Sequence, residues 1–172
     1  MSDAPTFGPI VSSAHLADGA LPALSELEFG LILAGHAFER WLVRCMTAAG
    51  EPGLTPIDVQ VLHSVNHRGR AKRLSDLCMV LGIEDTHVVL YAVKKLEKRG
   101  LVESRRAGKE KLIAATGKGV GTCARYRAVR EALLVEAVKG LGLDPKAASS
   151  VAGTLRALSG HYDQAARAAA SL

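Results

Sequence analysis

Basic side chains are concentrated in one part of the sequence, and their chemistry is that of phosphate binding. Residues 94–111 contain eight Lys or Arg but only three Asp or Glu. Residues 68–111 contain 12 basic and 6 acidic side chains, whereas the rest of the chain has 10 basic and 11 acidic ones. The net charge of +5 therefore comes from this part. A polyanionic partner such as a nucleic acid is the expectation, and a solvated basic surface without a partner is the alternative.

Residues 85–99 within this basic part have the periodicity of a helix with two different faces. At about 100° per residue, Val89, Ala92, Val93 and Leu96 gather on one side, which we expect to be buried. The opposite side has hydrogen-bonding groups first and plain positive charges later, as a helix in the major groove requires. The residues expected to contact DNA from this helix are Thr86, His87, Leu90, Tyr91, Lys94, Lys95 and Lys98.

Three residues of this helix leave alternatives open. Val88 and Leu90 flank the polar side, where they would contact thymine methyl groups or pack under neighbouring helices. Asp85 has the position of an N-cap, which satisfies free backbone N–H groups. Its carboxylate would alternatively accept a hydrogen bond from cytosine N4.

Two short strands are expected next, at residues 101–106 and 109–115, separated by Ala107 and Gly108. Like charges crowd this hairpin, and an anion would relieve their repulsion. We therefore expect contacts with phosphate or the minor groove. The residues assigned to the hairpin and to other backbone contacts are Arg68, Arg70, Arg73, Arg105, Arg106, Lys109 and Lys111.

The elements around this region complete a recognisable order. An irregular arm at 1–24 precedes a helix at 25–49, and "TPID" places Thr55 as N-cap of the next helix, with Pro56 at its first position. A short helix at 75–81 then leads to the amphipathic helix and the hairpin. Further helices are expected at 116–141, with Thr116 as N-cap, and from Asp144 almost to the end. The order predicts a mainly α fold with a small β-hairpin, the winged helix-turn-helix.

Several blocks resemble the MarR-type winged-helix transcription regulators, as a divergent branch with an N-terminal arm. They are "LTPIDVQVLHSV", "LSDLCMVLGI", "VKKLEKRGLVE" and "TGKG", between residues 54 and 119. "DTHVVLY" replaces the family's usual Ser/Thr/Arg run, and the hairpin lacks the Asp-x-Arg tip. The resemblance implies a dimeric, sequence-specific DNA-binding regulator, a ligand-responsive repressor. Its expected domains are the arm at 1–24, a first dimerisation helix at 25–53, the winged unit at 54–116 and C-terminal dimerisation helices at 117–172.

The resemblance also implies a small-molecule pocket between the dimer helices and the DNA-binding unit, with His36, Trp41 and His63 as lining residues. His63 and His67 are four residues apart, but no third metal ligand is near them in sequence, so we expect no metal and no cofactor. Motifs for nucleotide, serine-hydrolase or zinc-protease chemistry are missing, so we expect no enzyme.

The cysteine content of the sequence indicates a cellular compartment. Three widely spaced cysteines, Cys45, Cys78 and Cys123, indicate reduced thiols in the cytoplasm. We expect neither a secretory signal nor a membrane span. Two other functions remain open on the same scaffold: a module that binds RNA or an acidic protein, and a regulator that senses oxidants through cysteine.

Overall fold

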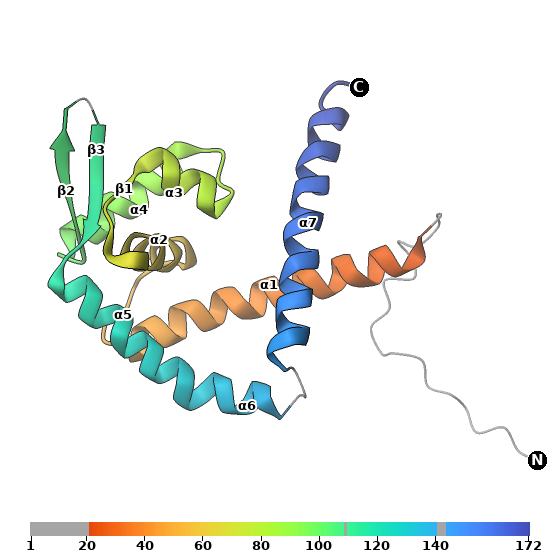
Figure 1. Cartoon of the computed structure of the whole chain (residues 1–172), viewed down its shortest axis with the longest axis horizontal. Helices are drawn as coiled ribbons and strands as arrows, with labels where there is room; N and C mark the ends of the chain where they lie inside the picture. Colours follow the sequence, from red (N-terminus) through yellow and green to blue (C-terminus); the bar gives the residue numbers. More distant parts are fainter. Residues whose placement is uncertain (1–20, 109, 141–143) are drawn as a thin grey trace, which may run out of the picture. The chain divides into compact units, whose positions relative to one another are not determined.

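The computed structural model describes residues 21–108, 110–140 and 144–172. In chain order the elements are α1 (Pro22–Ala48), α2 (Pro56–Asn66), β1 (Lys72–Arg73), α3 (Leu74–Leu81), α4 (Thr86–Lys98), β2 (Val102–Ala107), β3 (Glu110–Ala115), α5 (Gly117–Arg130), α6 (Glu136–Lys139) and α7 (Pro145–Ala169) (Figure 1). Contacts divide the chain into one unit that ends at Tyr126 and a second unit, Arg127–Leu172. Each unit is described separately.

The first unit is a winged helix, as the sequence predicted. The helices α2, α3 and α4 lie together beside the base of the β2–β3 hairpin (Figure 1). The sheet is antiparallel with the order β1-β3-β2. Strand β1 was not expected, because two residues are too few to show the alternation of a strand. It pairs Lys72 with Ile113 and Arg73 with Leu112, so that β3 is paired on both sides at these two residues.

The hairpin turn lies one residue later than the sequence suggested. Strand β2 continues to Ala107, which pairs with Glu110, and Arg106 pairs with Lys111. Gly108 begins the turn with a φ of +64°, a left-handed conformation that glycine adopts without a steric penalty. Lys109 lies outside the described residues. The expected turn at Ala107 and Gly108 was therefore wrong by one position.

The core of the first unit is built from the apolar stripes that the periodicity predicted. Val89, Ala92, Val93 and Leu96 of α4 are all buried, and α4 packs on α2 and α3. Truncating a fully buried leucine such as Leu96 to alanine would cost about 2–5 kcal/mol of stability. The other buried apolar side chains are Leu42, Cys45, Met46, Ala49, Leu54, Val59, Val61, Leu62, Val65, Leu77, Cys78, Leu101, Val102, Ile113, Cys123 and Tyr126.

Local capping sets where the helices of this unit begin. Thr55 accepts a hydrogen bond from Asp58 N, and the Asp58 side chain accepts one from Thr55 N at 2.7 Å, which completes the expected capping box. The Thr116 hydroxyl accepts from Gly119 N at 3.1 Å, as an N-cap does. Thr116 N in turn donates to Leu101 O at 3.1 Å, so the start of α5 is fastened to the start of β2.

Helix α1 begins at Pro22, three residues before the expected start, and residues 1–20 of the expected arm lie outside the described part. Proline suits a first helical position, because it has no N–H and a fixed φ. The C-terminal end of α1 is in the core. Farther back, Ile32, Leu33 and Phe38 are each 53% exposed, so this unit leaves much of the apolar surface of α1 uncovered.

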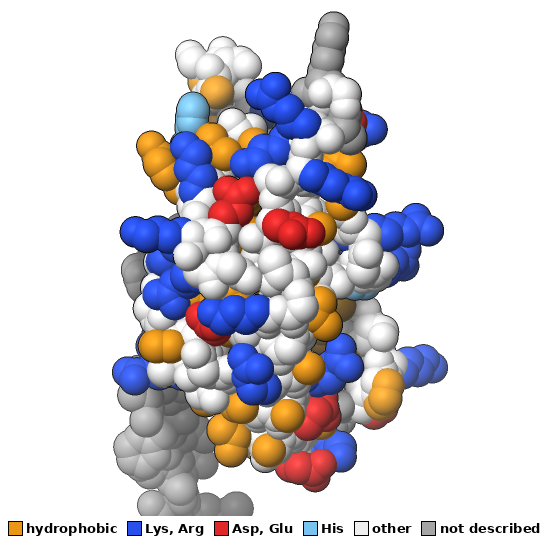
Figure 2. All heavy atoms as spheres, turned by 90° about the vertical axis from the view of Figure 1, so that its left-hand side faces the viewer, with side chains coloured by type: hydrophobic (Ala, Val, Ile, Leu, Met, Phe, Trp, Pro, Cys, Tyr) orange, Lys and Arg blue, Asp and Glu red, His pale blue; other side chains and the backbone are white. Residues whose placement is uncertain are grey.

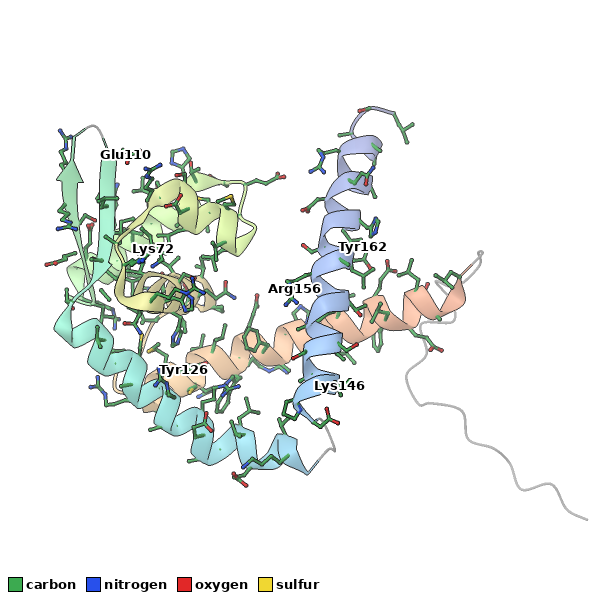
Figure 3. All side chains as sticks on the ribbon, in the orientation of Figure 1. Lys72, Glu110, Tyr126, Lys146, Arg156 and Tyr162 are labelled. Atoms are coloured by element: carbon green, nitrogen blue, oxygen red, sulfur yellow. The ribbon has the colours of Figure 1, made fainter. Side chains whose placement is uncertain are left out.

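The second unit contains the end of α5, α6 and α7. Residues Glu131–Val135 form a π-helical turn, so the single helix expected at 116–141 is interrupted, and Leu141 lies outside the described residues. Asp144 caps α7 by accepting from Ala147 N at 2.7 Å, as predicted. Lys146, Arg156 and Tyr162 project from α7 (Figure 3), and none of its residues is buried. None of the helices in the described part of the chain has the length and apolarity that a membrane crossing requires.

Candidate nucleic-acid interface

Helix α4 presents a polar face opposite its buried stripe. Thr86, His87, Tyr91, Lys94 and Lys98 are all exposed, as the helical spacing predicted. Tyr91 is 69% exposed, and the Lys94 ammonium lies 5.9 Å from the centre of its ring, within reach of a cation–π contact. The face thus offers hydrogen-bonding groups in its first two turns and free positive charge beyond them.

The structure at the start of α4 bears on two open alternatives, the role of Asp85 and the contacts of Val88 and Leu90. Asp85 is the N-cap, since its carboxylate accepts from His87 N at 2.8 Å. Val88 is exposed, whereas Leu90 is half-buried and therefore packs in part against the protein. A thymine contact from Leu90 remains compatible with its half-exposed position, because only part of the side chain is covered.

Lys95 differs from the expectation that it faces DNA. Its ammonium donates to the buried Asp58 carboxylate at 2.6 Å, from the helix α4 to the first turn of α2. This ion pair joins the two helices that pack most extensively in the core. Lys95 lies at the margin of the polar face, from which its side chain could extend toward DNA or toward α2. It extends toward α2, because the Asp58 carboxylate, 37 residues away in sequence, lies there. We therefore treat Lys95 as part of the scaffold.

Of the predicted cations in the sheet, two described ones in the hairpin are free for a partner, whereas one in the hairpin and one in β1 are paired within the protein. Arg105 and Arg106 are exposed, and neither has an ion-pair partner among the described residues. Lys111 lies 3.3 Å from Glu97 of α4, and Arg73 lies 2.9 Å from Glu110. Seen from the side of the hairpin, Lys and Arg side chains outnumber Asp and Glu and are spread over the surface (Figure 2).

The turn between α2 and β1 carries the remaining predicted cations, Arg68 and Arg70, and both are exposed. Arg68 has a φ of +60°, which is rare for a residue with a side chain and occurs often at functional sites. The Lys72 ammonium donates to His67 O at 2.8 Å and to Arg70 O at 2.7 Å, which holds the turn in shape. Lys72 and Glu110 are labelled in Figure 3. Sequence reasoning missed this role of Lys72, because it depends on backbone carbonyls rather than on a motif.

Two of the three residues proposed for a ligand pocket line different hollows in the described part of the chain. His36 lines a hollow of about 500 Å³ between α1 and the start of α2. His63 lines another, of about 380 Å³, bounded by α2, β1 and α3. Trp41 is half-buried on α1 and lines neither of these two hollows. The His63 ring meets the Tyr126 ring edge-on, with 4.4 Å between the ring centres. The His63 Nε2 has no hydrogen-bond partner in the described structure. Burial lowers the pKa of His63.

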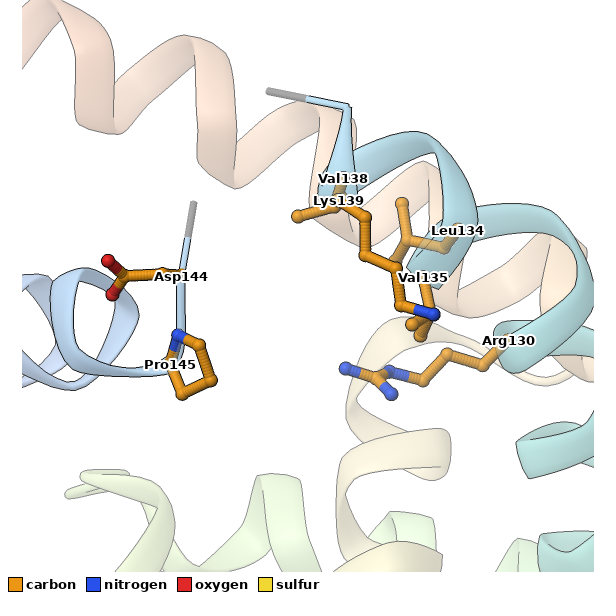
Figure 4. A pocket seen from close by; sticks show the side chains of 7 residues that line it. All are labelled: Arg130, Leu134, Val135, Val138, Lys139, Asp144 and Pro145. Carbon is orange, nitrogen blue, oxygen red and sulfur yellow. The ribbon is translucent and has the colours of Figure 1, made fainter. Parts of the chain in front are cut away.

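A further hollow lies within the second unit and is mainly apolar. It has a volume of about 490 Å³, and Figure 4 shows the Arg130 side chain reaching into it, toward Pro145. Arg130 also contacts Glu131 at 3.2 Å, and this pair is half-exposed to solvent. The lining residues are Arg130, Leu134, Val135, Val138, Lys139, Asp144 and Pro145.

The three cysteines lie inside the fold. Cys45, Cys78 and Cys123 are buried, and structural cysteines buried in this way are unreactive. No group of three or more His, Cys, Asp or Glu in the described ranges is arranged to hold a metal ion. His67 is exposed while His63 points into the packed interior near Tyr126.

Comparison with known proteins shows what this part of the chain resembles. Residues 54–119, from just before α2 to the start of α5, match the family described as "Winged helix DNA-binding domain". No curated protein matches the chain in sequence.

Solved structures show that the fold extends beyond this domain and is that of MarR-family transcriptional regulators. One from Rhodococcus sp. RHA1 is 20% identical, with a TM-score of 0.59, and the match covers 78% of this chain and 92% of that one. A MarR-family regulator from Neisseria meningitidis is 17% identical, with a TM-score of 0.64 and coverage of 84% and 96%. The repressor CouR, bound to a 23-mer DNA duplex, is 21% identical, with a TM-score of 0.63 and coverage of 82% and 98%. The predicted resemblance is thus confirmed at the level of fold.

Proposed function

We propose that the protein is a transcription regulator that binds a specific DNA sequence by placing α4 in the major groove. The observation that carries the proposal is the division of α4 within a winged-helix DNA-binding domain. One side is entirely buried, and the other exposes His87, Tyr91, Lys94 and Lys98. A helix with this division presents base-reading groups to the groove while its own domain holds it rigid.

Charges on the hairpin and on the turn after α2 would hold the DNA backbone. Arg105 and Arg106 extend from the hairpin, and Arg68 and Arg70 from the turn after α2, without acidic partners among the described residues. Unpaired cations gain the most from phosphate, because they lose no internal ion pair on binding. Lys109, which is outside the described residues, is proposed from the sequence to act in the same way. Lys111 and Arg73 contribute less, since each already contacts a carboxylate.

We further propose a homodimer that represses transcription until a small molecule releases it. The exposed apolar side chains of α1 and the unburied α7 support a second copy as the partner that covers them. Two-fold symmetry would place two α4 helices about 34–36 Å apart, which requires a pseudo-palindromic site. Of the structural neighbours, CouR was also solved with p-coumaroyl-CoA. In this chain, the apolar hollow beside Arg130 would accept an apolar effector that carries an acid group.

Selection from a random-sequence duplex pool, followed by mobility-shift titration, tests the proposal. We expect the protein to enrich one pseudo-palindromic sequence and to bind it at least about 1,000-fold more tightly than a random duplex of equal length. Binding of RNA, or of polyglutamate as an acidic polypeptide, with equal or greater affinity would instead favour an interaction module. Equal affinity for all duplexes would contradict sequence-specific regulation.

The proposal assigns binding rather than catalysis, because the matched domain is a DNA-binding one. It also places the protein in the cytoplasm, which agrees with the odd number and wide spacing of its three cysteines. Oxidant sensing is the weaker alternative. It predicts that peroxide releases the DNA and that this response disappears when the cysteines are replaced, whereas buried thiols predict no response.

A further inference from the structure

A buried carboxylate lies where three elements of the DNA-binding unit meet. Glu51, in the loop between α1 and α2, is only 6% exposed. Its Oε1 lies 2.8 Å from the Lys118 ammonium in the first turn of α5, and its Oε2 lies 3.4 Å from the guanidinium of Arg99, the C-cap of α4. The sequence did not predict this cluster: Glu51 lies outside the blocks that resemble the family, and nothing in the sequence connects it with Arg99 or Lys118, which lie 48 and 67 residues farther along the chain.

Hydrogen bonds from charged side chains to backbone carbonyls tie the same three elements together. Arg99 donates to Pro52 O at 2.7 Å, so its guanidinium bridges the loop and the end of α4. Lys118 also donates to Arg99 O at 3.0 Å, which fastens α5 to that end. Arg125 of α5 donates to Ala49 O, at the end of α1, at 2.7 Å. The last turn of α4 is therefore connected to the last turn of α1 through charged groups and their hydrogen bonds.

The contribution of Glu51 to folding stability does not by itself explain a buried carboxylate. Desolvation of the charges offsets much of their attraction, and an apolar replacement of similar volume is often as stable. Here only the carboxylate is buried, while the Arg99 and Lys118 side chains are 31% and 51% exposed, and keeping both cations beside that buried charge favours one geometry. The loop is also closely packed, since a Cβ at Gly53 would lie 3.1 Å from the Arg99 guanidinium. The cluster thus favours one orientation of the end of α4 against α1.

We propose that Glu51 is a positioning residue for DNA recognition: with Arg99 and Lys118 it sets the angle at which α1 presents α4 to the major groove. This inference rests on the proposed DNA-binding function and adds a residue that does not touch DNA. A partner that binds the exposed apolar stretch of α1 would change the arrangement of that helix, and this cluster would transmit the change to α4.

The test uses the full-length protein and two duplexes of equal length, the one that the wild type selects from a random pool and a random one. Glu51→Gln keeps the shape and removes the charge. We expect the ratio of selected to random affinity to fall about three- to thirtyfold, while random-duplex affinity changes little. Glu136→Gln is the matched control, because it removes the same charge from an exposed ion pair with Lys139, and its ratio should stay at the wild-type value. Circular dichroism and thermal unfolding show whether each variant is folded at the assay temperature.

Lys118→Gln and Lys118→Arg keep the inference testable if Glu51→Gln does not fold. Lys118 is exposed, so neither change leaves a cavity. The glutamine variant should lower the ratio and the arginine variant should preserve it, because arginine keeps the charge beside Glu51. A folded Glu51→Gln protein with the wild-type ratio would overturn the inference, as would a wild-type ratio for Lys118→Gln. Failure of the wild type to select any sequence would instead overturn the proposed function and, with it, this inference.

Discussion

His87 and Tyr91 are the side chains of α4 best placed to read bases, because both are exposed within its first two turns. Replacing either by alanine should cost about 1–3 kcal/mol of affinity for the selected sequence and relax preference at one base pair. Random-duplex affinity should hardly change, since neither side chain is a lysine or arginine of the kind that neutralises phosphate. The measurement compares both duplexes at one salt concentration. Equal losses on both duplexes would assign the residues to positioning or folding, and no loss on either would show that α4 is rotated from the proposed orientation.

Arg105 and Arg106 should act through phosphate rather than bases, since they are exposed on the hairpin without an acidic partner among the described residues. The double change to alanine should weaken binding to every duplex by similar factors. The slope of log affinity against log salt should become shallower by about 0.9 for each phosphate that the variant no longer neutralises. Lys111→Ala serves as a comparison, because its ammonium already pairs with Glu97 and its removal should change the slope less. An unchanged slope in the double variant would show that the hairpin does not reach the backbone.

His63 should make folding stability depend on pH. Burial lowers its pKa below the ordinary value of 6.5, so the unfolded chain binds a proton more readily than the folded one. Stability is therefore fully present above about pH 6.5 and declines as the pH falls below that value. Urea unfolding at pH 7.5 and pH 5.5 should show a smaller difference for His63→Leu than for the wild type. A difference of the same size in both proteins would assign the pH dependence to other groups.

At the scale of elements, the start of α5 touches β2 so closely that only glycine fits at position 119. A Cβ there would lie 2.0 Å from Leu101 O, and backbone cannot move aside as a flexible side chain can. Gly119→Ala should therefore destabilise the first unit by about 1–3 kcal/mol or more, as overpacking does. Gly117→Ala is the control in the same helix, where a Cβ meets nothing within 4 Å. Chemical denaturation measures both, and equal stabilities would mean that α5 shifts to accept the methyl group.

At the scale of the whole molecule, the exposed apolar side chains of α1 predict an obligate homodimer. Sedimentation velocity at micromolar concentration should give about twice the chain mass. Leu33→Asp or Phe38→Asp, each at a side chain that is 53% exposed, should break the dimer and the binding of the selected duplex together. Glu39→Gln, on the same exposed stretch, should leave both unchanged. A folded wild-type monomer that still binds the selected duplex would contradict this prediction.

Features set by neighbouring residues were predictable from the sequence. The buried stripe of α4 follows from side chains that recur every three or four residues, and the caps at Thr55, Asp85 and Asp144 follow from short polar side chains just before helices. The basic hairpin after α4 completed the winged-helix order. These features rest on local geometry, which a few adjacent residues determine.

The pairing of charges was decided only by the tertiary structure. Lys95 and Lys98 look alike in the sequence, yet Lys95 contacts Asp58 at 2.6 Å while Lys98 is exposed. Glu51 gave no signal in the sequence, although it lies at the centre of an ion cluster. The sequence by itself therefore determined which segments form helices and where positive charge accumulates. The fold decided which charges remain free for DNA, because ion pairs form between residues that only packing brings within about 4 Å.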